Sequence, residues 1–458
     1  MEESELNQGT PSKQKARSNE YGNKSAHIIG SDSWLQVGVM LTTSFNCGYI
    51  LSFSNLQFVP LGWTWGIICL LFFGVYTFYT HWLIAGFHII KGQRFIRFRD
   101  LMGYTCGSEM YYVTFFLQYL VIILTNMGFI LLGGRALKAI NDEYSDNPWR
   151  LQYYIVLTGV AFFIFAFCVP TMSEMGIWLI PSTIVTFCYV ITLLVVVIND
   201  GKDNTNHDYH VSGNQEDRVF QAFNAISAIV VCSSSGLLPE IQSTLQKPEV
   251  SNMRKALSMQ YTVGIVFYYG VSISGYWAYG SSVSDYLPDQ LSGPRWVKVL
   301  INTAVFLQSI VSQHTFVMPI HEALDTYFLQ MDKSMNSLEN HKRRFYLRFL
   351  LFAGNTFVAA ALPFMSDFVN LFGALALIPL TLVFPSLIFV NVKGKTARLG
   401  ENLWHWFNII TFSLLAIVAT IAAFRLIVNS VQYTFCNIVH SISRVIAGSS
   451  LFKREKKR

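Results

Sequence analysis

One stretch of the chain, VVCSSSGLLPEIQ from Val230 to Gln242, places polar side chains within an apolar run. Three consecutive serines and Gly236 are followed by Pro239 and a single carboxylate, Glu240. Hydroxyl groups both donate and accept hydrogen bonds, and a carboxylate in apolar surroundings is a candidate for taking up and releasing a proton. These residue types at this spacing suit reversible binding of a polar molecule, with no covalent step.

A second polar cluster, TTSFNCGYILSF from Thr42 to Phe53, interrupts another apolar run with Ser44, Asn46 and Gly48. The chain contains no C-x-x-C, H-E-x-x-H or G-x-x-x-x-G-K-[ST] motif, so a paired-ligand metal site and a phosphate-binding loop receive no support. The seven cysteines form no disulfide framework. We therefore expect no enzyme activity, no cofactor and no metal site.

Long gaps between charged residues indicate the elements that carry these clusters. Only 13% of the residues are charged, against about 25% in soluble proteins. The 58 residues between Asp32 and Lys91 fit two membrane spans joined by the turn Val59–Gly66. Nine further gaps of 18 to 29 residues lie at 110–134, 151–173, 175–199, 219–239, 256–284, 299–321, 349–366, 368–392 and 402–424. Since a membrane helix needs about 20 apolar residues, the pattern predicts an all-α integral membrane protein with eleven transmembrane helices.

Lysine and arginine residues predict how these helices are oriented. With the N-terminus inside, the inner segments hold 19 Lys and Arg residues and the outer loops hold seven. This asymmetry favours a cytoplasmic N-terminus. A further seven basic residues lie from Arg425 to the end of the chain, in a region where charge has little influence on topology. The net charge of +6 therefore reflects membrane topology, and we expect no nucleic-acid partner.

The predicted domain organisation follows from the same gaps. Residues 1–32 form a disordered cytoplasmic tail, 33–428 the membrane domain and 429–458 a basic C-terminal tail. Within the membrane domain, about 33–199 and about 219–392 each hold five helices, and about 402–427 adds one more. Spans 1 and 6 carry the two polar clusters and, being five apart, cross the membrane in opposite senses. This arrangement is typical of inverted five-helix repeats with broken helices 1 and 6.

Broken helices at the membrane midplane can bind both ends of a zwitterion, because free N–H groups attract an anion and free carbonyls attract a cation. We expect the span 1 cluster to receive a carboxylate and the span 6 cluster to receive an amine, between spans 1, 3, 6, 8 and 10. The alternative is that the small residues serve close helix packing. The candidate substrate-binding residues are Ser44, Asn46, Cys47, Gly48, Asn126, Ser233, Ser234, Ser235 and Gly236.

Two residues are candidates for proton coupling. Glu240 is the only carboxylate within or bordering span 6, and His314 lies in the middle of span 8. An intramembrane acid is a functional candidate by default, and histidine titrates nearest to neutral pH. The alternatives are that Glu240 pairs with Lys247 or another basic residue of the inner loop, and that His314 is a structural hydrogen-bonding residue. The proton is thus the expected coupling ion.

Long stretches of the sequence resemble the plant proline transporters of the amino acid/auxin permease family. They include SDSWLQVGVMLTT (Ser31–Thr43), IRFRDLMG (Ile96–Gly103), LLPEIQSTLQKPEVSNMRKAL (Leu237–Leu257) and GYWAYGSSVSDYL (Gly275–Leu287). The resemblance runs from about Ala26 to Ile427. It implies a LeuT/APC-like fold with broken helices and proton-coupled uptake of proline, glycine betaine or GABA-type zwitterions, at the plasma membrane.

The chain departs from this family in the predicted pocket. Two glycines of span 1 are replaced by Ser44 and Ser52, and an asparagine of span 2 is replaced by His81. In span 6, the three residues directly before Gly236 are serines in this chain. The changed pocket weakens the assignment of proline as substrate. Alternatives are transport of another neutral amino acid or organic acid, a substrate-sensing transceptor and, with least support, a membrane-embedded enzyme. The partners indicated by the sequence are the membrane lipid and a small-molecule zwitterionic substrate, and it leaves protein partners unspecified.

Overall fold

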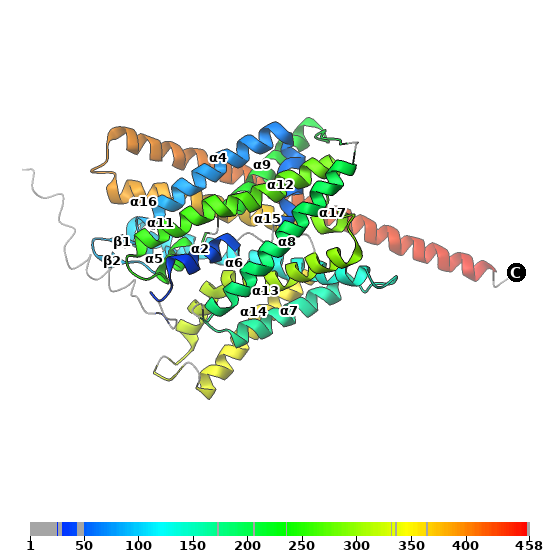
Figure 1. Ribbon diagram of the computed structural model, residues 1–458, viewed down its shortest axis with the longest axis horizontal. Helices are drawn as coiled ribbons and strands as arrows, with labels where there is room; N and C mark the ends of the chain where they lie inside the picture. The colour runs from blue at the N-terminus through cyan, green and yellow to red at the C-terminus, as the bar shows by residue number, and fades with distance from the viewer. Residues whose placement is uncertain are drawn as a thin grey trace, which may run out of the picture.

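The computed structural model describes residues 25, 30–43, 50–171, 174–204, 207–234, 236–330, 332–334, 337–362 and 365–455. Within these residues the fold is a helical bundle (Figure 1), as the charge-free gaps predict. The described strands are β1 (Ile89–Ile90) and β2 (Gln93–Arg94), which pair antiparallel in a short hairpin. This hairpin lies at the end of the bundle where α5 (Phe98–Cys106) is found.

The first five predicted spans are found in order. Gly62, with φ of 66°, interrupts the helix between spans 1 and 2 within the expected turn Val59–Gly66. Glycine suits this position because a positive φ is costly for other residues. Span 1 consists of α2 (Trp34–Thr43), α3 (Ile50–Phe53) and the π-helix η1 (Ser54–Phe58), and spans 2 to 5 are α4 (Val59–Ala85), α6 (Ser108–Asp142), α7 (Leu151–Cys168) and α8 (Gly176–Asp203).

The second five spans repeat this order. The short helices η3 (Gly280–Ser282) and η4 (Leu287–Gln290) lie in the loop between spans 7 and 8. Spans 6 to 9 are α9 (Gln215–Ser233) with α10 (Leu238–Ser243), α11 (Glu249–Met259) with η2 (Gln260–Gly264) and α12 (Ile265–Tyr279), α13 (Arg295–Phe328), and α14 (Leu338–Ala361). Span 10 comprises α15 (Met365–Phe372), the π-helices η5 (Gly373–Leu377) and η6 (Pro379–Val383), and α16 (Phe384–Lys393).

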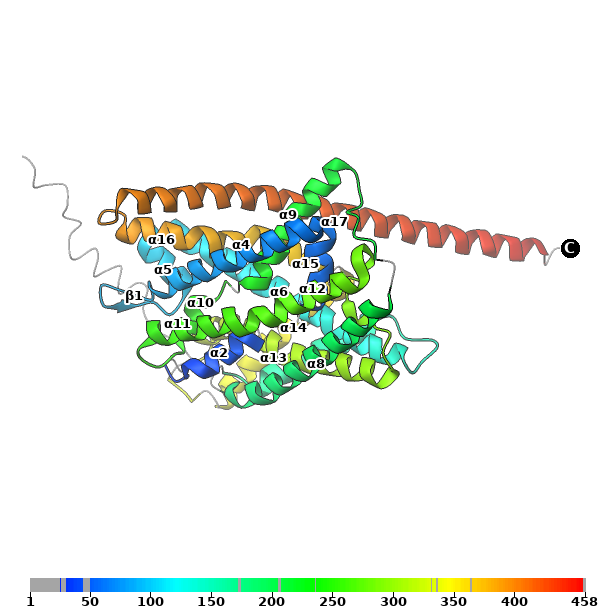
Figure 2. The same cartoon turned by 45° about the horizontal axis from the view of Figure 1, so that its top comes forward.

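The last helix, α17 (Leu399–Glu455), contains the predicted eleventh span and extends beyond the bundle (Figure 2). Seven helical segments of the described chain are long and apolar enough to cross a membrane, including Val369–Lys393 and the Leu399–Asn429 part of α17. The remaining predicted spans are interrupted or carry more polar residues. Large apolar side chains on the outer faces, such as Val75 (71% exposed) and Ile177 (79% exposed), fit lipid contact.

Corresponding helices of the two sets of five spans make corresponding contacts. In the first half of span 1, α2 packs on α11 of span 7, and in span 6, α9 packs on α4 of span 2. Likewise α8 of span 5 packs on α13 of span 8, and α15 of span 10 packs on α6 of span 3. Each pair maps onto the other when the repeats are exchanged, as expected for two structurally related halves. Helices α6 and α13 share the most extensive contact in the bundle.

Span 10 approaches span 6 closely at Gly373. A Cβ atom on Gly373 would lie 2.7 Å from the backbone oxygen of Ser227 in α9. Because a backbone atom cannot move aside as a flexible side chain can, only glycine fits at this contact. Spans 6 and 10 are thereby held against each other beside the candidate site.

We expect Gly373→Ala to destabilise the protein, because overpacking of this kind costs about 1–3 kcal/mol. The matched control is Gly354→Ala in α14, where an added Cβ meets no atom within 4 Å. Thermal unfolding of the purified variants measures the difference. Equal melting temperatures for the two variants would show that the close approach at Gly373 is not a constraint.

Candidate functional site

The predicted site divides between described and undescribed residues. Ser44, Asn46, Cys47 and Gly48 lie between α2 and α3, outside the described residues, as does Ser235 between α9 and α10. The structure places the other candidates on α9, α10, α6 and α13 and in the segment between α9 and α10.

The break in span 6 occurs where the serine cluster predicts it. Helix α9 ends at Ser233, Ser234 is extended (φ −137°, ψ 157°), and α10 begins at Leu238. Gly236 has φ of 66°, and a Cβ atom there would lie 2.9 Å from Cδ2 of Leu377. Both the backbone conformation and the space therefore require glycine at the break.

The two described serines bind the end of their own helix. Ser233 Oγ donates to the Ile229 carbonyl at 3.1 Å, and Ser234 Oγ donates to the Val230 carbonyl at 2.6 Å. Val230 is one of the last four residues of α9, whose carbonyls have no following helical turn to pair them, whereas the Ile229 carbonyl lies one residue earlier and faces the backbone N–H of Ser233 within the helix. Each hydroxyl oxygen can still accept a hydrogen bond. Each serine can therefore accept an N–H from an amine while its own proton is donated to a carbonyl of α9.

A tyrosine and a histidine from two other spans hold the last carbonyl of α9. Tyr261 in η2 donates its hydroxyl proton to the Ser233 carbonyl at 2.5 Å, and its oxygen lies 2.9 Å from Nδ1 of His81 in α4. Since the hydroxyl has one proton, Nδ1 of His81 must be the donor in the second bond. The residue that replaces the family's asparagine thus reaches the break through Tyr261.

Glu240 connects three helices. Its Oε1 accepts a hydrogen bond from the backbone N–H of Phe98, the first residue of α5, at 2.8 Å and one from Nε2 of Gln118 in α6 at 3.0 Å. The same Gln118 amide lies 3.2 Å from the Gly236 carbonyl in the break. Both donors to Glu240 are neutral, and among the described residues its Oε2 has no hydrogen-bond partner. Glu240 therefore forms hydrogen bonds to Phe98 and Gln118, and no salt bridge joins it to Lys247.

Several of the buried polar groups without partners among the described residues lie in spans predicted to line the pocket. Asn126 in α6 is 1% exposed, and neither of its amide atoms has a hydrogen-bond partner within the part of the chain that the structure describes. The same holds for the Ser52 hydroxyl, both Gln313 amide atoms and Oδ1 of Asn370, which lie in spans 1, 8 and 10. An unpaired buried polar group costs about 1–3 kcal/mol, so these groups are suited to bind a polar ligand.

Sequence reasoning identified Asn126 but missed Gln313 and Asn370. Both residues could have been found as amide side chains inside charge-free gaps, Gln313 in SQHTF and Asn370 in DFVNLF. Tyr261 was also missed, because tyrosine is common in this chain and its contact with Ser233 joins positions 28 residues apart across a helix break.

His314 lies away from the break. Its Nε2 donates to the carbonyl of Val169, the residue after α7, at 2.7 Å, and its ring meets Phe165 edge-on at 5.2 Å. This contact joins α13 to α7 and fixes the tautomer with a proton on Nε2, since a carbonyl can only accept. This geometry fits the alternative that His314 is a structural hydrogen-bonding residue.

Ion pairs close the bundle at the end where α5 lies. Arg97, just before α5, donates to both oxygens of Glu322 in α13, at 2.6 and 3.3 Å. Asp325, three residues later, forms a fully buried pair with Arg348 of α14 at 2.7 Å. Arg97–Glu322 and Phe98–Glu240 therefore attach the N-terminal end of α5 to spans 8 and 6.

The arrangement combines the described break in span 6, unpaired buried polar groups and a carboxylate beside that break. It is suited to bind and release a polar solute within a membrane, and it defines a membrane transporter rather than an enzyme. A family model described as "Transmembrane amino acid transporter protein" matches residues 30–426. The chain belongs to this family of amino acid transporters.

Curated relatives cover most of the chain. "GABA transporter 1" of Arabidopsis thaliana is 30% identical over 415 residues, covering 86% of this chain and 91% of the relative. "Lysine histidine transporter-like 6" of Arabidopsis thaliana is 26% identical over 387 residues, covering 82% of this chain and 87% of the relative.

Solved structures show the fold. MhsT in complex with L-phenylalanine gives a TM-score of 0.57 at 11% identity, covering 86% of this chain and 100% of MhsT. A mutant of the manganese transporter of Eremococcus coleocola gives a TM-score of 0.52 at 12% identity, covering 89% of this chain and 94% of that one. The LeuT/APC-like fold expected from the sequence is confirmed.

We expect Tyr261→Phe to destabilise the protein by about 1–3 kcal/mol, because it leaves the Ser233 carbonyl and Nδ1 of His81 without a buried partner. Tyr327→Phe is the matched control, since Tyr327 is 82% exposed. Thermal unfolding compares the two variants. A Tyr261→Phe protein that melts with the control would show that the hydroxyl does not hold the end of α9.

Proposed function

We propose that this protein is a secondary active transporter that imports small zwitterions of the proline, glycine betaine or GABA type together with protons. The observation that carries the proposal is the position of Glu240. It is a part-buried carboxylate beside the break of span 6, held by neutral donors from two other helices. The relative named as a GABA transporter supports a zwitterionic substrate.

The substrate is proposed to bind at the break between α9 and α10. The C-terminal end of α9 carries partial negative charge, which favours the ammonium group, and the hydroxyl oxygens of Ser233 and Ser234 accept its protons. Asn126 offers a buried amide on the facing helix α6. The undescribed span 1 cluster is proposed to bind the carboxylate.

Proton coupling is proposed to act through the bond between α10 and α5. A hydrogen bond to a charged carboxylate is roughly twice as strong as one to a neutral group. Protonation of Glu240 therefore weakens its bonds to Phe98 and Gln118, and α10 can separate from α5. Release of the proton restores the charge and the contact. Because His314 bonds to Val169 away from this contact, its proposed relay role is secondary.

The driving force is sufficient for accumulation. One proton crossing 100 mV provides about 2.3 kcal/mol, and one pH unit adds about 1.4 kcal/mol. Together they support on the order of 500-fold accumulation of a neutral zwitterion. We place the protein in the plasma membrane with its N-terminus and α5 on the cytoplasmic side, consistent with the distribution of Lys and Arg.

We expect a yeast strain lacking amino acid uptake to accumulate labelled GABA, proline or glycine betaine when it expresses this protein, with faster uptake at pH 5 than at pH 7.5. The panel includes neutral amino acids and an organic acid, and surface expression is measured in parallel. Absence of uptake of every solute, with the protein at the cell surface, contradicts transport and favours a substrate sensor. Uptake that is insensitive to pH and protonophore contradicts proton coupling.

We expect Glu240→Gln to remove the difference in uptake between pH 5 and pH 7.5. Glutamine keeps a carbonyl oxygen for the bonds from Phe98 and Gln118 but cannot titrate. Glu109→Gln is the matched control, because Glu109 is an exposed carboxylate in the first turn of α6. A Glu240→Gln protein that retains the full pH dependence of uptake assigns Glu240 a structural role.

A further inference from the structure

A basic pocket of about 500 Å³ lies between the last turns of α4 and the helix α11, and we call it the α4–α11 pocket. The two helices contact each other at the end of the bundle where the hairpin is found (Figures 1 and 2). One wall is formed by Ser251, Arg254, Lys255 and Ser258, whose spacing places them on one face of α11. Trp82 of α4 forms the other wall.

Arg254 is held in this pocket by an aromatic ring and has no acidic partner. Its guanidinium carbon lies 4.9 Å from the centre of the Trp82 ring, and its buried Nε has no hydrogen-bond partner among the described residues. No described carboxylate lies within 4.0 Å of Arg254 or Lys255, whereas Arg94 at the same end of the bundle pairs with the buried Glu249. The two cations of the pocket are therefore available to a ligand.

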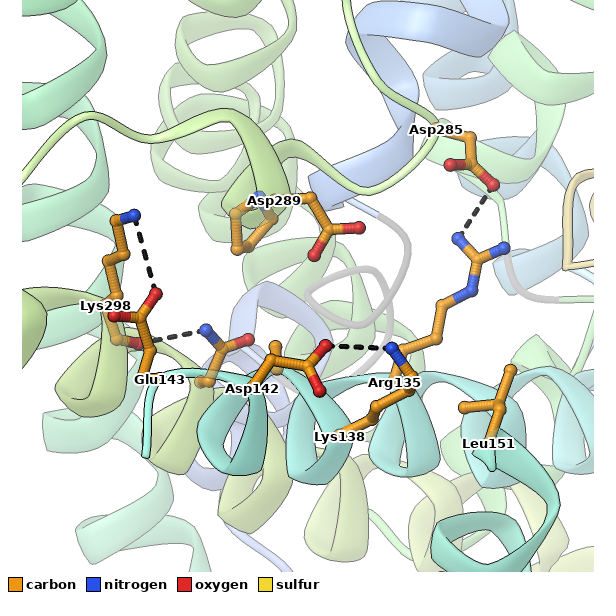
Figure 3. A pocket seen from close by; sticks show the side chains of 11 residues that line it. Arg135, Lys138, Asp142, Glu143, Leu151, Asp285, Asp289 and Lys298 are labelled. Carbon is orange, nitrogen blue, oxygen red and sulfur yellow. Dashed lines mark hydrogen bonds and ion pairs between the residues drawn. The ribbon is translucent and has the colours of Figure 1, made fainter. Parts of the chain in front are cut away.

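The lining of the α4–α11 pocket contains two cations and no acid. The charged pocket at the opposite end of α6 provides a contrast (Figure 3). There, Arg135, Lys138 and Lys298 each lie within 4.0 Å of a carboxylate of the same pocket. Those charges are balanced within the protein, whereas the charges of the α4–α11 pocket are complemented by an anionic ligand.

The position of the pocket indicates that the anion carries apolar chains. The charge-free gap of span 7 begins at residue 256, directly after Lys255, so the pocket lies at the boundary of the apolar layer. Trp82 is a residue type enriched at this boundary. Beyond the pocket, both spans continue with exposed apolar side chains, Val75 in α4, seven residues before Trp82 and on its face, and Val266 in α12. Hydrocarbon chains of a ligand can lie along this surface.

We propose that the α4–α11 pocket binds the phosphate headgroup of an anionic phospholipid. Arg254 donates N–H groups to the phosphate oxygens, the exposed hydroxyl of Ser251 donates a further hydrogen bond, and Lys255 adds a second positive charge. The acyl chains lie against the outer faces of spans 2 and 7. Under the proposed orientation the lipid belongs to the cytoplasmic leaflet, whose anionic lipids attract basic segments. The site binds a lipid and not the transported solute, so it goes beyond the proposed function.

The test is native mass spectrometry of the full-length protein, purified in detergent micelles and titrated with dioleoylphosphatidylglycerol or dioleoylphosphatidylcholine. Both lipids have the same acyl chains, but only the first has a net negative charge. Each Lys or Arg near the surface contributes a factor of about five to the binding of anionic lipid. We expect the first phosphatidylglycerol molecule to bind roughly 25-fold more tightly than the first phosphatidylcholine molecule.

Variants assign the binding to the pocket. We expect Lys255→Gln to weaken phosphatidylglycerol binding about fivefold, and Arg254→Gln with Lys255→Gln to weaken it roughly 25-fold. Phosphatidylcholine binding should not change. The matched control is Lys395→Gln with Arg398→Gln, which removes the same charge from two exposed residues between α16 and α17, at the same end of the bundle and outside the pocket.

Three results would overturn the proposal. They are equal affinities of the wild-type protein for the two lipids, equal phosphatidylglycerol affinities for the pocket variant and the matched control, and displacement of phosphatidylglycerol by millimolar inorganic phosphate. The last result would assign the pocket to a soluble phosphate and not to a lipid. If the double pocket variant does not fold, Lys255→Gln decides, because Lys255 is exposed and its loss leaves the contact between Arg254 and Trp82 intact.

Discussion

The structure depends on one constraint, which is that backbone polar groups must be paired where no water is available. Interrupting span 6 leaves the carbonyls at the end of α9 without helical partners. Ser234 pairs the Val230 carbonyl, Tyr261 pairs the last one, and Gln118 reaches the Gly236 carbonyl. The break is therefore maintained by side chains from other spans, and any movement of those spans changes how it is paired.

The same contacts link the break to the ends of the bundle. Glu240 and Gln118 connect it to α5, and Arg97 connects α5 to Glu322 of span 8. At the opposite end, Arg135 joins α6 to Asp285 in the loop before α13. Close helix approach, as at Gly373, limits small rearrangements, so the bundle favours discrete states. Alternation between such states is what a transporter requires.

The sequence predicted the order of spans, the break in span 6 and Glu240 as its bordering acid, because charge spacing and glycine–proline placement are local signals. It did not predict the partners. No local pattern indicates that Glu322 pairs with Arg97 or that Asp325 pairs with Arg348. The link from His81 through Tyr261 to Ser233 depends on how segments up to 180 residues apart pack together, and no local pattern encodes it.

The central claim is that a zwitterion binds at the break between α9 and α10, opposite Asn126. A cryo-EM structure of the protein with a saturating concentration of its transported amino acid tests this most directly. The account predicts density for the ligand beside Ser234 and Gly236, with its amine at the end of α9. Ligand density confined to another region, with the break unchanged and empty at saturation, would contradict it.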